Sequence, residues 1–480
     1  MQLVAASGLT VASAQGADAP VLRVRDLSPL TADGAANVAK IQARIDAIAW
    51  SYTALQSGGT VLIPPGLWPT TGTITNRPGI TLQGAGPAGS FNGPTVLQRT
   101  TDTVMITLDG AGPDVATQRF RGGGIKDLVL HGSDTAAAIV QQTHGSSLTF
   151  AGVAFLACTG LSAMDCVDIQ DSFITRCRWD YCANTNTAGA TCLRIRNSAA
   201  ASGWRSSTNN SNEIRIRDCI FESFKGSCVT LEPGTGSVAP MDGVYLDGFK
   251  METGTVRAPY ITVAGDCFRV MVTRGYAYGD ALDAGASAVD FLRDYSGATF
   301  RDVEVSTPAA VFRTFAQVWD NGYHDYQGVA FGLNDPTTCF VESMGTNTPT
   351  LTLQGNRWGV ATPLVSIPGG GAPKIVSHSP AAQVVSWTGT VTPDPYAGET
   401  IQATLTGNTT VNAPARSHVG QRLRFIFTQD ATGSRTVTWN AAYKLAGGTW
   451  SPTTTANKTN VIEFERRGAV WSEVTRSLNQ

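Results

Sequence analysis

Two Arg-Ile-Arg segments are the most conspicuous candidates for binding chemistry. A strand that buries the isoleucine of each segment points both of its arginines outward. Arginine forks bind carboxylates in bidentate fashion, and a tyrosine ring offers a flat surface for a sugar face. If the two segments lie on adjacent strands, they form a basic patch with an aromatic wall. The predicted glycan-binding residues are Arg194, Arg196, Arg215, Arg217, Tyr245, Asp168 and Asp247.

Two interpretations of this patch stay open. One is a groove that binds an acidic glycan. The other is a solvated sheet face whose arginines are balanced by aspartates on neighbouring strands. Like charges that lie directly opposite each other on a sheet cost stability, which favours the second interpretation.

Acidic residues are the candidates for catalysis. Hydrolysis of a glycosidic bond needs two carboxyl groups about 5–10 Å apart, one of them with a raised pKa. Asp280 and Asp283 share one segment with Tyr276 and Tyr278, and Glu222 is a third candidate. The alternative is that these acids are only solvated or form turns.

Several sequence motifs of other chemistries are absent. The chain has no Gly-Lys-Ser/Thr phosphate loop, no G-x-S-x-G and no HExxH sequence. It also has no CxxC pair, which counts against a zinc site. The sequence therefore predicts neither a cofactor nor a metal.

A repeated six-residue tile must position these side chains. It reads apolar, any residue, Asp or Gly, two residues of any kind, apolar. Asp and Gly tolerate a positive φ, so the third place predicts a sharp bend between two short strands. The tile starts at Ile125, Phe150, Ile169, Ile195, Ile216, Leu246, Val270, Phe300, Tyr326 and Leu353, about 25 residues apart on average.

One bend in every coil of about 25 residues is typical of a right-handed parallel β-helix. A β-sandwich with turns at similar spacing is the alternative. In the β-helix the conspicuous aspartates of the tile are turn formers and poor candidates for catalysis. They are Asp127, Asp171, Asp218 and Asp302.

The ends of the chain have their own patterns. Residues 1–30 are a flexible or docking segment. Apolar residues from Asn37 to Leu55 recur at near-helical spacing and predict one amphipathic helix. Residues 31–378 hold this helix and the β-helix, residues 379–397 are a linker, and residues 398–480 alternate as a small antiparallel β-sandwich.

Two segments resemble known families. The order DG, helix, GGTVLIPPG and ITLQGAG, over residues 30–90, resembles the start of the pectate-lyase-like β-helix of phage tailspikes and polysaccharide-degrading enzymes. In that family the helix caps the first coil. The segment GQRLRFIFTQDATGSRTVTWNAAYKLAGG is similar to the C-terminal domains of phage tail fibres and tailspikes, which promote trimerisation or contact the host surface.

Composition further narrows the class of protein. The net charge of −2 gives no general attraction to nucleic acid or to an anionic membrane, and no apolar run is long enough for a membrane span. Nine cysteines follow no disulfide spacing, so we expect buried free thiols and folding in the reducing cytoplasm of the host.

The resemblance implies a virion protein, a phage tail receptor-binding protein that recognises a bacterial surface polysaccharide. It also implies a homotrimer that attaches to other tail proteins through its N-terminus. Two alternatives remain: an active polysaccharide depolymerase, either hydrolase or lyase, and a secreted bacterial pectate-lyase-like enzyme.

Overall fold

The computed structural model describes most of the chain. The described residues are 21–23, 30–48, 58–86, 93–111, 119–185, 187–198, 210–233, 240–253, 258–265, 267–279, 287–291, 297–306, 314–318, 323–331, 339–343, 349–354, 356, 365–366, 374–377, 383–395, 399–414, 417 and 420–478.

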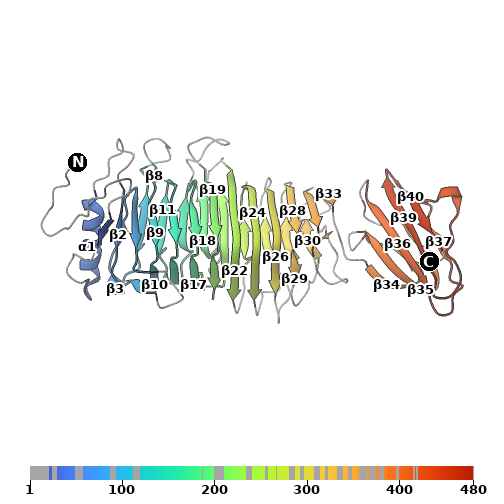
Figure 1. Ribbon diagram of the computed structural model, residues 1–480, viewed down its shortest axis with the longest axis horizontal. Helices are drawn as coiled ribbons and strands as arrows, with labels where there is room; N and C mark the ends of the chain where they lie inside the picture. The colour runs from blue at the N-terminus through green and yellow to red at the C-terminus, as the bar shows by residue number, and fades with distance from the viewer. Residues whose placement is uncertain are drawn as a thin grey trace.

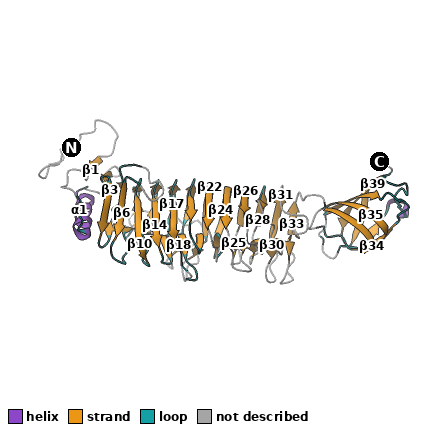
Figure 2. Cartoon of the chain, turned by 90° about the horizontal axis from the view of Figure 1, so that it is seen from below, coloured by secondary structure: helices purple, strands orange, loops and turns teal. Residues whose placement is uncertain are grey.

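The body of the protein is a parallel β-helix whose coils stack along its long axis, and the strands of the coils form three faces (Figures 1 and 2). This confirms the predicted fold class, and the right-handed sense is the one that parallel crossovers adopt. One 20-stranded sheet forms the first and second faces because it bends sharply along a line between them, and an 11-stranded sheet forms the third face.

The strands of the first face precede the bend. They are β2 (Gly59–Leu62), β5 (Ile80–Gln83), β9 (Gly124–Lys126), β13 (Thr149–Ala151), β16 (Phe173–Thr175), β19 (Asn212–Arg217), β28 (Tyr323–Gln327), β31 (Thr350–Gln354) and β33 (Lys374–Ser377). Three long strands run through the bend and serve the first and second faces. They are β22 (Met241–Thr253), β24 (Cys267–Gly279) and β26 (Gly297–Ser306).

The remaining strands of the second face are β3 (Gly66–Thr70), β6 (Thr95–Arg99), β10 (Val129–Thr135), β14 (Ala154–Cys158), β17 (Arg178–Cys182), β20 (Ile220–Glu222) and β29 (Ala330–Phe331). The third face consists of β4 (Ile74–Thr75), β7 (Ile106–Asp109), β11 (Val140–Thr143), β15 (Ser162–Val167), β18 (Thr191–Asn197), β21 (Ser227–Pro233), β23 (Ile261–Val263), β25 (Ser287–Phe291), β27 (Thr314–Val318), β30 (Cys339–Ser343) and β32 (Val365–Ser366). Two further strands, β8 (Phe120–Arg121) and β12 (Gly145–Ser146), pair with each other.

Alternation along each strand separates the core from the surface. In β19 the side chains of Ile214 and Ile216 are fully buried, while Arg215 and Arg217 point outward. Aromatic rings stack inside the solenoid from coil to coil, with Trp179 4.6 Å from Phe221 between ring centroids. Eight cysteines, from Cys158 to Cys267, are buried and form no disulfide bond, as predicted.

The bend between the first and second faces holds one residue at positive φ in each of eight successive coils. In register these residues are Asp127, Gly152, Arg176, Asp218, Gly248, Arg274, Asp302 and Gly328, with φ between 52° and 65°. We call this row the bend ladder. It repeats the order Asp, Gly, Arg. The glycine follows the aspartate because a Cβ at Gly152, Gly248 or Gly328 would lie only 2.5–2.7 Å from the carboxylate of the preceding coil.

The bend ladder corrects the predicted repeat. The coil predicted to start its tile at Ile169 starts it at Ile174, since Ile174 pairs with Phe150 and with Ile216. Ile195 lies on the third face and starts no coil, and Val272 replaces Val270. The sequence prediction was wrong here because arginine, at Arg176 and Arg274, occupies a bend that the tile reserved for Asp or Gly.

The predicted N-terminal helix is present as α1 (Gly34–Ala47), and it begins earlier and ends earlier than expected. Asp33 caps it by accepting hydrogen bonds from the backbone N–H groups of Ala35 and Ala36. Ile41 and Ile45 are buried against the first coils. Strand β1 (Val21–Arg23) pairs with β2, while the rest of the predicted docking segment, except for Leu30, lies outside the described residues, as does Leu55.

The C-terminal unit has its own aromatic core. Its elements are β34 (Gln383–Val391), β35 (Thr400–Val411), β36 (Arg422–Gln429), β37 (Val437–Trp439), β38 (Tyr443–Lys444), the 3-10 turn η2 (Ala446–Gly448), β39 (Thr459–Arg467) and β40 (Val470–Ser477). The predicted antiparallel pairing joins β36 to β39 and β39 to β40, whereas β34, β35 and β36 pair in parallel. Strand β34 lies within the predicted linker, and its Trp387 packs into this core.

Candidate functional site

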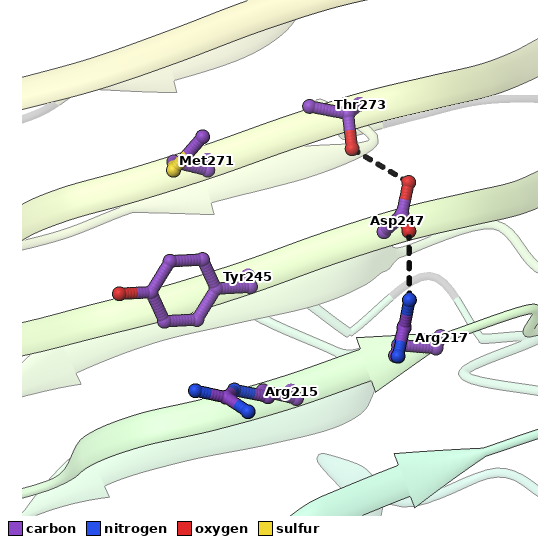
Figure 3. Close-up of a pocket in the computed structure, with 6 residues that line it drawn as sticks. All are labelled: Arg215, Arg217, Tyr245, Asp247, Met271 and Thr273. Carbon is purple, nitrogen blue, oxygen red and sulfur yellow. Dashed lines mark hydrogen bonds and ion pairs between the residues drawn. The ribbon is translucent and has the colours of Figure 1, made fainter.

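A groove of about 350 Å³ crosses the first face over three successive coils (Figure 3). Strand β19 supplies Arg215 and Arg217, β22 supplies Tyr245 and Asp247, and β24 supplies Met271 and Thr273. The register places these residues in two parallel columns, one of Arg215, Tyr245 and Met271 and the other of Arg217, Asp247 and Thr273. The structure therefore brings together four of the seven predicted glycan-binding residues.

Arg215 lies between two aromatic rings. Its guanidinium carbon is 5.7 Å from the centroid of the Phe173 ring in the preceding coil and 5.8 Å from that of Tyr245 in the following coil. Such contacts are cation–π interactions. Phe173 is 40% exposed, so this stack is open to solvent at the edge of the groove.

Asp247 is the acid of the groove and is firmly held. Arg274 binds it with two nitrogen atoms, one at 2.8 Å from Oδ1, and Thr273 donates to it at 2.7 Å. These hydrogen bonds, chiefly those from Arg274, lower the pKa of Asp247 to about 2. Arg217 is farther from the carboxylate, with its Nη2 atom 3.7 Å from Oδ2.

A second arginine satisfies the acids on the other side of the groove. Arg269 binds Asp242 at 2.6 and 2.8 Å and Glu213 at 3.0 Å. The hydrogen bond to Asp242 is the main reason that the pKa of Arg269 is raised. Arg215 is 3.7 Å from Glu213, the same separation that Arg217 has from Asp247. Among the described residues, both arginines of β19 thus have only long ion pairs, with acids that other arginines already bind closely.

The other predicted arginines lie elsewhere. Arg194 and Arg196 belong to β18 on the third face. Arg194 forms an ion pair with Glu232, and Arg196 binds Asp165 with two hydrogen bonds of 3.0 and 3.1 Å. The prediction that all four arginines line one patch was wrong, because Ile195 is not the start of a coil. For these two residues the alternative of a salt-bridged face holds.

Asp168 is also separate from the groove. It is fully buried where the third face turns towards the first. Its Oδ2 atom is 3.0 Å from Nδ1 of His144, and its Oδ1 accepts a hydrogen bond of 2.8 Å from the N–H of Ser198. Its contacts are those of a structural group.

The structure describes one of the three predicted catalytic residues. Glu222 lies in β20 on the second face, where it is bound by Arg178 and lies 3.4 Å from Nζ of Lys250. Asp280 and Asp283 lie outside the described residues. Tyr276 and Tyr278 belong to β24 on the second face, with ring centroids 6.4 Å apart.

The sequence prediction missed Phe173, Thr273 and Arg274 as parts of this site. The signal for Phe173 was the alternation Phe173-Ile174-Thr175. This segment takes the same place in its coil as Arg215-Ile216-Arg217, but the tile shows this only if the bend that follows it may be an arginine, here Arg176. Among the described residues, no group of three or more His, Cys, Asp or Glu side chains is placed to hold a metal ion. No helix in the described part of the chain is long and apolar enough to cross a membrane.

Solved structures with a similar fold include viral and bacterial proteins. Geobacillus virus E2 ORF18 is 15% identical, with 95% of this chain and 76% of that chain covered and a TM-score of 0.47. The tailspike protein of Acinetobacter phage vB_ApiP_P1 is 13% identical, with 95% and 79% covered and a TM-score of 0.41. The A-module of the Azotobacter vinelandii mannuronan C-5 epimerase AlgE4 is 14% identical, with 74% and 96% covered and a TM-score of 0.39.

Sequence comparison adds one match. No curated protein sequence matches the chain. Residues 387–471 match the family model described as "Putative phage tail fibre C-terminal domain", and this span runs from β34 to β40. The chain thus carries a C-terminal unit similar to phage tail fibre C-terminal domains, which confirms the resemblance to phage tail fibre proteins seen in its sequence.

Proposed function

We propose that this chain is a phage tail receptor-binding protein that recognises a bacterial surface polysaccharide through the groove on the first face. The observation that carries the proposal is the open stack of Phe173, Arg215 and Tyr245 beside Arg217. Aromatic rings and arginine forks are the side chains that suit a sugar face and its acidic substituents.

The scaffold also suits recognition. All six lining residues are on strands whose hydrogen-bonded neighbours fix them on both sides, so little order has to be gained on binding. The tail fibre match at residues 387–471 supports a location in the virion tail.

Further parts of the proposal follow from the resemblance. The protein acts as a homotrimer and attaches to other tail proteins through residues 1–30. The eight buried cysteines, which form no disulfide bond, fit folding in the reducing cytoplasm of the host before assembly. Light scattering tests the trimer, since its mass is three times the 50.4 kDa of one chain.

Binding to intact bacteria and to their purified capsule or lipopolysaccharide tests the recognition itself. Tyr245→Ala should weaken binding about tenfold, because it removes a wall of the groove. Tyr323→Ala is the matched control, since Tyr323 is a 54% exposed tyrosine of the same face outside the groove. Equal loss in both variants, or no binding to any purified polysaccharide, contradicts the proposal.

The same incubation addresses the depolymerase alternative. New reducing ends indicate hydrolysis, and absorbance of unsaturated sugars indicates a lyase. If either product forms, the variant Glu222→Gln tests whether the second face carries that activity. A fully active variant excludes Glu222 as a catalytic residue.

A further inference from the structure

The two arginines of β19 hold positive charge that their neighbours do not neutralise closely. Arg215 and Arg217 are 49% and 54% exposed, and each has an acid only at 3.7 Å. Their acids, Glu213 and Asp247, are bound at shorter range by Arg269 and by Arg274. An incoming anion can therefore take hydrogen bonds from both arginines without leaving either acid unpaired.

The adjoining coils offer a different chemistry. Tyr245 and Met271 continue the Arg215 column towards the C-terminal end of the solenoid, and Asp247 and Thr273 continue the Arg217 column. These two coils present a ring and a thioether for sugar faces, with a carboxylate and a hydroxyl for sugar hydroxyls. Among the described strands that line the groove, only β19 presents two cations to it.

Coil spacing sets the length scale of the groove. Neighbouring strands lie about 4.8 Å apart, so the three coils span about 10 Å between the outer strands. One pyranose residue lengthens a linear glycan by a distance similar to this spacing. A chain that runs along the solenoid axis therefore meets one coil with each sugar.

We infer that the groove binds a linear glycan along the solenoid axis, with one oxyanion substituent, a sugar carboxylate or a phosphodiester, held by both Arg215 and Arg217. The next two sugars towards the C-terminal end lie over Tyr245 and Met271. This inference rests on the proposed function and adds to it the position of the charged substituent and the direction of the glycan chain.

Chemical modification of the glycan tests the charge. The probe is the surface polysaccharide purified from a strain that the wild-type protein binds, compared with the same polymer after reduction of its carboxyl groups and after removal of its phosphodiesters. Binding that falls at least about tenfold after one treatment identifies that oxyanion, since hydrogen bonds to charged groups are each worth this much. Undiminished binding after both treatments overturns the inference and leaves the proposed function standing.

Protein variants test the position. Arg215→Gln and Arg217→Gln should each weaken binding about tenfold and should flatten its dependence on salt. The control is Arg301→Gln, because Arg301 follows Arg217 in the same column three coils later, is 47% exposed and also has an acid, Asp325, at 3.7 Å. Equal weakening by Arg301→Gln would show a diffuse electrostatic effect and would contradict a defined oxyanion position.

Oligosaccharides of increasing length, prepared from the same polymer, test the direction. Affinity should rise up to three or four sugars and then level off, because the groove ends at β24. Affinity that keeps rising well beyond this length contradicts a three-coil site. If the protein binds no polysaccharide at all, the proposed function itself is contradicted. This outcome is distinct from the outcomes above, in which the polysaccharide binds but not as inferred.

Discussion

The first and third faces carry the same Arg-Ile-Arg segment with opposite consequences. On the third face, the strands on either side of β18 supply Asp165 and Glu232, and each arginine has its own close acid. On the first face, the strand before β19 supplies Phe173 and Thr175, and the strand after it supplies Tyr245 and Asp247. Of these four residues only Asp247 is an acid, and it is already bound by Arg274.

The difference shows that function on a solenoid depends on the neighbouring coils. An arginine becomes part of a structural ion pair when an adjacent coil supplies an unshared acid at the same position. It stays available to a ligand when the adjacent coil supplies an aromatic ring or an acid that another arginine binds. The sequence of one strand cannot distinguish these cases.

The largest expected effect concerns the bend that borders the groove. Gly248→Ala should lower the free energy of unfolding by about 2–4 kcal/mol. An alanine at this position must adopt a positive φ, and its Cβ would lie 2.5 Å from the Asp218 carboxylate. Denaturant titration measures it.

Gly122→Ala is the control for this substitution. Gly122 has a φ of 67°, close to the 65° of Gly248, but its added Cβ meets only ordinary contacts. The control should cost about 1–2 kcal/mol. Equal destabilisation by the two variants would show that backbone strain alone matters and that the carboxylate does not shape the bend.

The next effect separates the two faces directly. Arg196→Gln should lower the free energy of unfolding by about 1–2 kcal/mol, because it leaves the mostly buried Asp165 without its bidentate partner. Arg217→Gln should change it by less than about 0.5 kcal/mol. Binding to the polysaccharide should instead weaken more in Arg217→Gln than in Arg196→Gln. A similar loss of stability in both variants would remove the distinction between the faces.

Unfolding at acidic pH should show how strongly Arg274 stabilises the charged form of Asp247. Because the pKa of Asp247 is lowered to about 2 in the folded protein, its contribution is complete above pH 4 and is lost as the pH falls towards 2. Above pH 4 the free energy of unfolding of wild type should exceed that of Asp247→Asn by about 1 kcal/mol, a value that allows for solvent screening. This difference should shrink as the pH falls towards 2. A difference that stays constant from pH 5 to pH 2 would show that the ion pair contributes nothing.

The smallest effect concerns the ring beside Arg215. Phe173→Leu should weaken polysaccharide binding about twofold, because a cation–π contact at an exposed site is worth about 0.5 kcal/mol. Leu161→Ala serves as a control at a 51% exposed apolar side chain outside the groove. Binding that is unchanged by Phe173→Leu would leave Tyr245 as the sole aromatic contributor.

The fold was largely predictable because its two signals are local. Alternation of apolar residues predicts strands, and Asp or Gly at the third place of the tile predicts the bends. Both follow from steric limits that act within a few residues. The Asp33 cap of α1 is equally local.

The site was only half predictable, and the reason is register. Arg176 and Arg274 adopt positive φ, where arginine has no local preference, so neighbouring coils must hold them there. Without these bends the sequence suggested one coil too many, and Arg194 and Arg196 were placed beside Arg215 and Arg217. The ion pairs of Arg269 and Arg274 depend on register in the same way.

The bend ladder has a consequence for how this solenoid can change in length. An aspartate in one coil requires glycine in the next, and the arginine that follows glycine cannot sit directly on an aspartate without placing its Cβ at the carboxylate. Removal of a coil that holds a glycine sets an arginine directly on an aspartate, whereas removal of three successive coils restores Asp, Gly and Arg in sequence. We therefore expect deletion of a single glycine coil to destabilise the solenoid and deletion of three successive coils to be tolerated, so that the bend ladder limits the steps in which this solenoid can grow or shrink.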